Sequence, residues 1–403
     1  MKSSNENLYQ AAWFVDQANA SGTASDANVG DSAAHALLTD DEMKRRLGGD
    51  NRRWRTLVDT TITYMSGTST YVPFDVKLGL GDLTIIGTST ASSGSLTSNL
   101  TAANRAAQTL NKVTDTGRNW STQTNKVVRI ASGARAGAQW WTSVDTGSGI
   151  AEVSTPGTPS TAWPNFARAT PQSGDPYSIL TPPALTCGQW RFDLDNSAGK
   201  KVTIKDLALN FNGMTNGIYG DAAAINIQAC SITDAVVKAD FIFFEQCLTL
   251  GYLWLDPGAY ATILACLHRS HVQLNAGSFA LIDFDDLYDA GGALTLLGAC
   301  TANVGTACVR GRGVSDDAVV VADGAFIRNT QQIDSATQLW GSSNAGHGVV
   351  VKGGSGLHYT NQPTVNAGVG PGRELNLGGT DYQYSAVPSG QVNAANGARF
   401  VPY

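Results

Sequence analysis

The chain has 403 residues, enough to bury a large hydrophobic core, and its length alone would favour two or three globular domains. Charged residues make up only 15% of it while Gly numbers 44, a composition typical of strands and turns rather than helices. The formal net charge of −6 argues against a nucleic-acid-binding protein that is held by phosphate contacts.

The first residues and the apolar runs bear on cellular location. The start, residues 1–7, lacks the apolar core of a signal peptide, and nowhere do eighteen apolar residues follow one another. We therefore expect a protein that is made in the cytoplasm and is not inserted in a membrane.

The six cysteines fall at positions 187, 230, 247, 266, 300 and 308. They form no CxxC pair, and no histidine lies at a metal-type spacing from them. The pattern predicts buried free thiols, and it predicts neither a metal nor a cofactor.

The first half of the chain contains few regular segments. Residues 1–12 are polar, and Trp13–Val15 is expected to form a first short strand. Strand-like runs follow at residues 60–64 and 83–86. Two stretches, residues 88–125, rich in Ser, Thr and Asn, and residues 154–183, rich in Pro, Gly and Ser, are predicted to be lateral insertions.

A short helix is predicted between these strands. Thr39 and Glu42 have the spacing of a capping box, in which the threonine hydroxyl accepts the Glu42 N–H and the glutamate carboxylate accepts the Thr39 N–H. Acidic residues fill the first turn and basic residues the last, which suits the helix dipole. We predict a helix over about residues 40–47, with Met43 and Leu47 covering the open apolar end of the first coil.

From Val202 onwards the sequence becomes regular. Apolar residues and cysteines of four segments align at steps of 23, 17 and 19 residues: residues 202–209, 225–232, 242–248 and 261–267. The alignment places Leu207, Cys230, Cys247 and Cys266 in one buried column, at one strand spacing of about 4.8 Å.

A second repeat agrees with this alignment. A turn-plus-strand signature, with Gly at the corner and an aromatic residue two positions later, recurs in residues 256–260, 275–279 and 322–326. The first two copies are 19 residues apart, and the third follows after about two coils plus an insertion. Such periods, with short strands, are typical of an all-β parallel β-helix, a solenoid of stacked coils.

The N-terminal region resembles the opening segment of pectin-lyase-like right-handed parallel β-helix proteins. The resemblance covers Trp13-Phe14-Val15-Asp16, then Asp26-x-Asn28-x-Gly30-x-Ser32, then Leu37-Leu38-Thr39 before the predicted helix. In that family these segments cap the N-terminal end of the solenoid. The family usually has Pro shortly before the Thr, where this chain has His35-Ala36. The resemblance implies a right-handed parallel β-helix with a short N-terminal capping helix and lateral insertions.

Two further stretches are similar to segments of β-helical bacteriophage proteins. One is Gly133-Ala134-Arg135-Ala136-Gly137-Ala138 with Trp140 and Trp141, ending at Gly174-Asp175-x-Tyr177; the other is Gly346-x-Gly348-Val349-Val350-Val351-Lys352-x-Gly354-Ser355-Gly356 with Gly379-Thr380-x-Tyr382. These similarities imply a virion protein, and the resemblance to phage spikes implies a homotrimer.

We divide the chain into five parts. They are an attachment segment (1–12); an N-terminal strand, capping helix and first coils (13–87); an insertion-rich region with Trp-containing strands (88–185); regular coils (186–335); and C-terminal coils and tail (336–403).

One acidic cluster is a candidate catalytic site. Glu245 and Asp283 fall in the same column two coils apart, about 10 Å from each other, which is within reach of inverting glycoside hydrolysis. His268-Arg269, one coil before Asp283 and Asp285, is the only place where a lyase site could be fitted. The crowded aspartates 283, 285, 286 and 289 also suit a solvated corner or a calcium site, and we expect no working active site there.

Two further sets of residues are candidates for binding. Trp140, Trp141 and Trp163 lie in or near the predicted insertions and could stack on sugars, although adjacent tryptophans of a strand point to opposite faces, so at least one of the first two belongs to a core. A cationic set could dock an acidic partner or could match the helix dipole: Lys44, Arg45, Arg46, Arg52 and Arg53.

Three functions are compatible with these features. We favour a non-enzymatic virion component of a bacteriophage, a spike, fibre or surface protein that contacts other virion proteins and in some cases a host surface polysaccharide. The alternative is a polysaccharide-cleaving tailspike, a glycoside hydrolase or lyase. A secreted bacterial adhesin is disfavoured by the sequence start.

Overall fold

The computed structural model describes residues 10–304 and, beyond them, the strands alone. Within that range it leaves out residues 20–21, 49–53, 66–67, 103–110, 155–156, 159–166, 169, 195–198, 214–215, 222–223, 284 and 290–293. No helix of the described part is long and apolar enough to cross a membrane.

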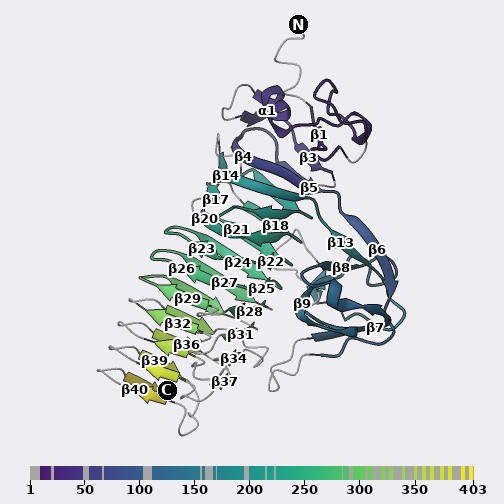
Figure 1. Cartoon of the computed structure of the whole chain (residues 1–403). Helices are drawn as coiled ribbons and strands as arrows, with labels where there is room; N and C mark the ends of the chain where they lie inside the picture. Colours follow the sequence, from purple (N-terminus) through teal and green to yellow (C-terminus); the bar gives the residue numbers. More distant parts are fainter. Residues whose placement is uncertain are drawn as a thin grey trace.

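The chain is a parallel β-helix (Figure 1). Each regular coil contributes one strand to a 13-stranded parallel sheet, here the first sheet, and two short strands to a 20-stranded sheet, the second sheet. Because each strand pairs with its counterpart one coil later, stacking buries the inner face of every coil against its neighbours. The predicted fold is confirmed.

The first sheet contains, in spatial order, β1 (Ala12–Val15), β3 (Thr60–Tyr64), β5 (Leu83–Gly87), β15 (Lys201–Lys205), β18 (Ala224–Gln228), β21 (Ile242–Glu245), β24 (Tyr260–Leu264), β27 (Phe279–Asp283), β30 (Thr301–Val304), β33 (Phe326–Asn329), β36 (Gly356–Tyr359), β39 (Thr380–Gln383) and β41 (Arg399–Pro402). The second sheet contains β2 (Trp54–Thr56), β4 (Thr68–Leu78), β14 (Ala184–Leu194), β16 (Ala208–Asn210), β17 (Gly217–Gly220), β19 (Ser231–Thr233), β20 (Ala235–Ala239), β22 (Leu248–Thr249), β23 (Leu253–Leu255), β25 (Leu267–His268), β26 (Val272–Leu274), β28 (Asp285–Asp289), β29 (Leu294–Leu297), β31 (Ala307–Gly311), β32 (Val319–Ala322), β34 (Gln338–Trp340), β35 (Val349–Val351), β37 (Thr364–Asn366), β38 (Arg373–Leu375) and β40 (Val392–Ala394).

The strand register agrees with the alignment made from sequence. Gln228 pairs with Glu245, and Glu245 pairs with Leu264, so the predicted steps of 17 and 19 residues are correct. The turn signature is also in register, because Tyr260 pairs with Phe279, and Phe326 follows two coils later.

A column of left-handed residues forms the corner between the first sheet and the short strands of the second. Asp206, Ala229, Gln246 and Ala265 all have φ between 53° and 56°. Such a conformation is strained for a residue other than Gly. Its recurrence on successive coils indicates that the stacked turns hold this geometry together.

The predicted cysteine column follows directly after this corner. Leu207, Cys230, Cys247 and Cys266 are completely buried in the solenoid core, and the cysteines are free thiols. Backbone hydrogen bonds join successive coils at the column, for example from the N–H of Leu248, the residue after Cys247, to the Cys230 carbonyl at 2.9 Å. The predicted buried thiol ladder is confirmed.

Helix α1 (Asp40–Gly48) lies over the N-terminal end of the solenoid (Figure 1). Met43 and Leu47 are buried in the same core as Trp13, Tyr64 and Phe74 from the entering strands. The predicted capping helix is confirmed in place and extent.

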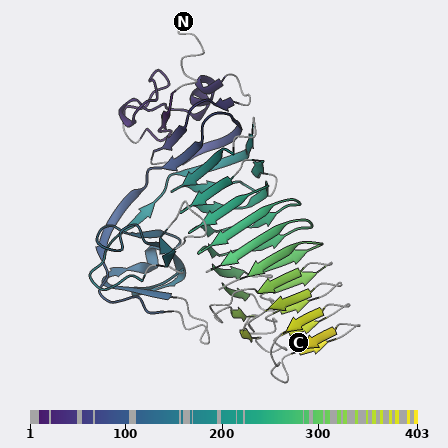
Figure 2. The same ribbon diagram turned by 180° about the vertical axis from the view of Figure 1, so that it is seen from behind.

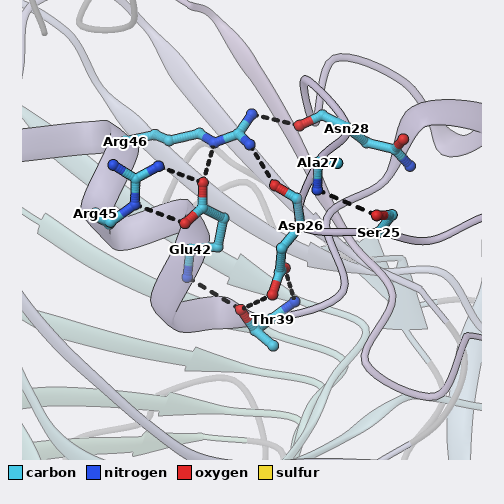
Figure 3. A network of polar contacts seen from close by, with 8 residues as sticks. All are labelled: Ser25, Asp26, Ala27, Asn28, Thr39, Glu42, Arg45 and Arg46. Atoms are coloured by element: carbon cyan, nitrogen blue, oxygen red, sulfur yellow. Dashed lines mark hydrogen bonds and ion pairs between the residues drawn. The ribbon is translucent and has the colours of Figure 1, made fainter. Parts of the chain in front are cut away.

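The cap of α1 differs from the predicted capping box in one bond. The Glu42 N–H donates to the Thr39 hydroxyl at 3.2 Å, as predicted, but the Thr39 N–H donates to Asp26 at 2.8 Å and not to Glu42 (Figure 3). The Glu42 carboxylate instead accepts bonds from Arg45 and Arg46. Two nearby guanidinium groups outcompete a single backbone N–H for this carboxylate.

The D-x-N-x-G-x-S turn has a definite role for each of its named residues. Asp26 caps α1, while the Asn28 side-chain amide donates to the carbonyls of Thr23 and Ala36. Gly30 has φ +77°, and a Cβ there would lie 2.9 Å from Leu37. Ser32 precedes the short 3-10 helix η2 (Ala33–His35).

Between β5 and β14 the chain leaves the solenoid and forms an antiparallel sheet beside it, here the insertion (Figures 1 and 2). Its elements are β6 (Thr90–Ser95), β7 (Asn111–Asn119), η3 (Trp120–Thr122), β8 (Val127–Ile130), β9 (Gln139–Thr146), β10 (Ser148–Val153), β11 (Gly157–Thr158), β12 (Ala167–Arg168) and β13 (Pro176–Thr181). The insertion has its own core, which includes Trp120, Trp140 and Tyr177. Arg135 and Asp175, from two distant parts of the phage-like stretch, form a two-pronged ion pair at 2.6 Å.

Side chains of the insertion contact the flank of the solenoid at several points. Trp141 packs against Leu248 and Leu267 of two successive coils. Arg129 of β8 forms an ion pair with Asp206 at 2.5 Å. Asn125 accepts a hydrogen bond of 2.7 Å from Arg269 in the turn after β25. The insertion therefore covers the left-handed corner and the short strands next to it.

Candidate functional site

The predicted acidic pair is in register, but its first member is not on an open surface. Glu245 and Asp283 occupy one column with Leu264 between them. Glu245 is only 5% exposed and accepts a hydrogen bond of 2.8 Å from Gln228. The insertion docks at the adjacent Gln246, where the Trp141 indole N–H donates to the backbone carbonyl. Asp283 belongs to β27, and its side chain lies outside the described part.

His268 lies inside the solenoid rather than beside an acidic face. It is completely buried, and its Nδ1 lies 2.8 Å from the Thr249 hydroxyl on the coil before. Burial lowers the pKa of His268 to about 3, so the ring is neutral. A buried, neutral ring at this position does not suit the lyase site that the sequence could be fitted to. Asp285, Asp286 and Asp289 belong to β28, but their side chains lie outside the described residues.

The described tryptophan candidates do not form a sugar-stacking surface. Trp140 and Trp141 are 0% and 1% exposed, and they point to different cores, as expected for adjacent strand residues. Trp140 packs inside the insertion, whereas Trp141 docks it. Trp163 lies outside the described residues.

The cationic set is largely engaged within the molecule. Lys44 pairs with buried Asp40, and Arg46 bonds to Glu42 and to the carbonyls of Asp26 and Asn28 (Figure 3). Arg45 is exposed but is bound to Glu42 by two hydrogen bonds of 2.6 and 2.7 Å. Arg52 and Arg53 lie outside the described residues. Lys44, Arg45 and Arg46 therefore make contacts within the N-terminal region, as expected if they stabilise the helix.

A groove of about 480 Å³ opens on the outer face of the second sheet. Strands β14, β17 and β20 of three successive coils form its floor, and the turn at Pro257–Gly258 forms one wall. Because outward-pointing residues of a β-helix repeat at the strand spacing, side chains of one kind can form columns along the long axis.

Two such columns line the groove. Arg191 pairs with Tyr219, and Tyr219 pairs with Lys238, so one column alternates cation, aromatic ring and cation. The second column consists of three carboxylates, each two positions after a member of the first column. Asp193 lies within β14, and Asp221 and Asp240 directly follow β17 and β20. An ion pair of 2.7 Å joins Arg191 to Asp193, and Asp221 accepts the Leu194 N–H at 2.6 Å.

The residues that line this groove were not among those predicted from the sequence. Its signal is a pattern of Asp two positions after a large side chain, repeated in Arg191-x-Asp193, Tyr219-x-Asp221 and Lys238-x-Asp240. The first copy precedes the segment at which the repeats become regular. Its register to the later copies is visible only from the strand pairing.

The groove suits a polar ligand with many hydroxyl groups. Carboxylates accept hydrogen bonds from hydroxyl donors, and lysine and arginine donate to hydroxyl or anionic oxygens. Among the residues that the structure describes, no group of three or more His, Cys, Asp or Glu side chains could hold a metal ion.

Fold and groove together define a parallel β-helix protein with a polar groove on the outer face of its second sheet. No protein-family model matches the chain, and a search of curated proteins finds no match. Among solved structures, the chain is similar to the Gp54 tailspike of Acinetobacter baumannii bacteriophage AP22, solved in complex with A. baumannii capsular saccharide: 9% identity, TM-score 0.28, covering 85% of this chain and 72% of that one.

Two other tailspikes are similar to a comparable extent. The tailspike gp49 from Pseudomonas phage LKA1 has 12% identity and TM-score 0.30, with coverage of 86% and 74%; the Pseudomonas phage phi297 tailspike gp61 has 12% identity and TM-score 0.19, with coverage of 87% and 61%. At TM-scores of this size the similarity bears on neither function nor site. The fold assignment rests on the strand pairing itself.

Proposed function

We propose that the chain is a β-helical spike or fibre of a bacteriophage particle that contacts host-surface polysaccharide without cleaving it. The observation that carries the proposal is the groove with its two columns, one of Arg191, Tyr219 and Lys238 and one of carboxylates. The columns repeat at the strand spacing, so the groove presents similar chemistry at regular steps along the axis. A polysaccharide presents hydroxyl groups at regular steps in the same way.

The rest of the assignment is supported by the sequence. The stretches 133–177 and 346–382 resemble segments of phage β-helical proteins, which favours a virion component. In this proposal residues 1–12 attach the chain to other virion proteins, and three chains associate as a homotrimer.

Binding of purified chain to bacterial capsular polysaccharides and lipopolysaccharides, immobilised as a panel, tests the proposal. We expect at least one glycan to bind, and we expect Tyr219→Ala and Lys238→Ala to weaken that binding. Lys201→Ala, an exposed lysine on the first sheet, is the control and should bind like the unmodified chain. Equal loss in all three variants, or binding unaffected by the two groove variants, would exclude the groove as the contact surface.

Polysaccharide cleavage is the second candidate, and the carboxylate column favours it. Neighbouring members stand about one strand spacing apart, near 5 Å, and the outer two about 10 Å apart. These separations approach those of retaining and inverting glycosidases. Chain-length analysis of a bound polysaccharide after incubation decides between the candidates. Shortened chains that disappear with Asp221→Asn would establish cleavage at this groove, and unchanged chain length supports attachment alone.

A further inference from the structure

An aromatic cluster lies on the outer face of the second sheet, on the coils that follow the groove. Tyr252 precedes β23, Trp254 lies within it, and His271, which is buried at 8% exposure, precedes β26. Tyr252 is 45% exposed, and its ring centroid lies 6.2 Å from that of Trp254 and 5.7 Å from that of His271. The interplanar angles are 61° and 69°, so neither neighbour is stacked parallel to the Tyr252 ring.

A chain of polar side chains runs from this cluster along β26. His271 Nε2 lies 3.1 Å from Gln273 Oε1, Gln273 Nε2 donates to Asn275 Oδ1 at 2.7 Å, and Asn275 Nδ2 donates to Asp256 Oδ1 at 3.3 Å. The chain fixes the orientation of both amides. Each amide nitrogen carries a second N–H beyond the one used here, and each amide oxygen has two acceptor sites.

The cluster and the groove form one continuous surface. The Asp256 N–H donates to the Val237 carbonyl at 2.8 Å, which places Asp256 one coil beyond Lys238. Asp256 is followed directly by Pro257 and Gly258, which line the groove. The groove occupies the coils of β14, β17 and β20, and the cluster occupies the next two coils, β23 and β26.

We propose that this cluster, Tyr252 with Trp254, His271 and Gln273, is a second saccharide subsite that binds an uncharged pyranose unit of the same chain that occupies the groove. The inference rests on the proposed function. The ring face of Tyr252 offers an apolar platform, and the fixed amides offer directed donors and acceptors for ring hydroxyls. The one charged side chain of the polar chain is Asp256, at the edge next to the groove.

The order of the coils determines how a bound saccharide would lie along the long axis of the solenoid. A saccharide that touches both surfaces must cross successive coils from β14 to β26, about 20 Å at the strand spacing. The groove then recognises the polar substituents of the ligand, and the cluster recognises the apolar face of a neutral unit.

A second exposed aromatic set on the molecule lacks this geometry and supplies the control. Phe241, Tyr260 and Phe279 stand in one column of the first sheet, and the rings of Tyr260 and Phe279 stack at 4.7 Å with an interplanar angle of 20°. Stacked rings cover each other's faces. Tyr260 is 41% exposed, close to the value for Tyr252.

The test uses the full chain on the same immobilised panel of capsular polysaccharides and lipopolysaccharides. For a glycan that binds, we expect Tyr252→Ala to raise Kd about tenfold, because the variant loses one aromatic contact. We expect Gln273→Ala to raise Kd severalfold. Tyr260→Ala should stay within about twofold. Circular dichroism of each variant confirms an intact fold.

The outcomes separate this inference from the function on which it rests. If Tyr219→Ala and Lys238→Ala weaken binding while Tyr252→Ala does not, the groove stands and the second subsite is overturned. If no glycan of the panel binds, the proposed function and this subsite both fall. Equal weakening by Tyr260→Ala and Tyr252→Ala would also overturn the subsite, since the effect would then not depend on an open ring face.

Discussion

Trp141 of the insertion donates its indole N–H to the backbone carbonyl of Gln246, at 2.6 Å, across 105 positions of the sequence. Gln246 is one of the left-handed corner residues, so its carbonyl is held in place by the stacked turns. The same indole ring packs on Leu248 and Leu267. One side chain therefore combines the polar and the apolar contact that dock the insertion on the solenoid.

Replacing Trp141 with Ala should release the insertion from the solenoid while both remain folded. Removing a large buried aromatic side chain costs on the order of 3–5 kcal/mol, and here the loss falls on the docking surface. Hydrogen exchange should rise at Gln246 and Leu248 but stay slow in β7 and β13. Trp140→Ala is the matched control, because it should raise exchange within the insertion core instead. Slow exchange throughout in Trp141→Ala would contradict the docking role.

The cap of α1 should depend on Asp26 as well as on Thr39. Thr39→Ala should cost about 1 kcal/mol of helix stability, as for other N-cap losses. Asp26→Ala should cost a similar amount, because it leaves the Thr39 N–H without its acceptor. Asp41→Ala, an exposed first-turn residue, is the control. Chemical denaturation monitored at α1 checks these values, and an Asp26→Ala variant as stable as Asp41→Ala would refute the assignment.

The thiols of the cysteine column should be inert in the native chain. Burial raises the pKa of Cys230, Cys247 and Cys266, which keeps them protonated, and only the thiolate reacts readily. A thiol reagent applied to native protein should label none of the three, and all should react in denaturant. Mass spectrometry of the labelled peptides identifies the sites. Rapid native labelling of all three would disprove the coil register.

Much of this fold could be predicted from the sequence because its signals are local and periodic. The cysteine column follows from the repeat of 17 to 23 residues, and the start of the helix follows from Thr39 and Glu42, although the bond to Asp26, thirteen positions earlier, was not predicted. The site could not be predicted in the same way. Whether Glu245 is open or sealed depends on where residues 90–181 fold back, and that contact joins Trp141 to a turn more than a hundred positions away. The inward orientation of the His268 side chain depends on the corner turn before β25, because that turn sets which residues of the strand face the core. The composition of the sequence does not indicate this orientation.

His268 should make stability depend on pH. Its pKa falls from 6.5 to about 3 on folding, because burial disfavours the charged ring. The unfolded chain therefore binds more protons than the folded chain below pH 6.5, and stability should fall by a few kcal/mol as pH decreases from about 6.5 to 3. His268→Leu, which introduces the residue found one coil later at Leu287, should flatten this dependence. Denaturation midpoints measured across this pH range test the prediction. If the midpoint changes equally with pH in His268→Leu and in the unmodified chain, His268 is not the source of the pH dependence.

Glu245 tests the non-enzymatic proposal most directly. It is a nearly buried carboxylate, in register with Asp283, and such a setting can create the unequal acidities that glycoside hydrolysis requires. Its bond with Gln228 and the docked insertion beside it favour a structural role, since substrate cannot reach a sealed side chain. We therefore expect Glu245→Gln, which keeps the size and one acceptor oxygen, to leave glycan binding and polysaccharide chain length unchanged. Asp240→Asn in the open groove is the matched comparison, and it should weaken binding. If the unmodified chain shortens a host polysaccharide and Glu245→Gln alone abolishes this while the fold stays intact, the insertion must open to admit substrate, and the chain is a tailspike hydrolase acting at Glu245.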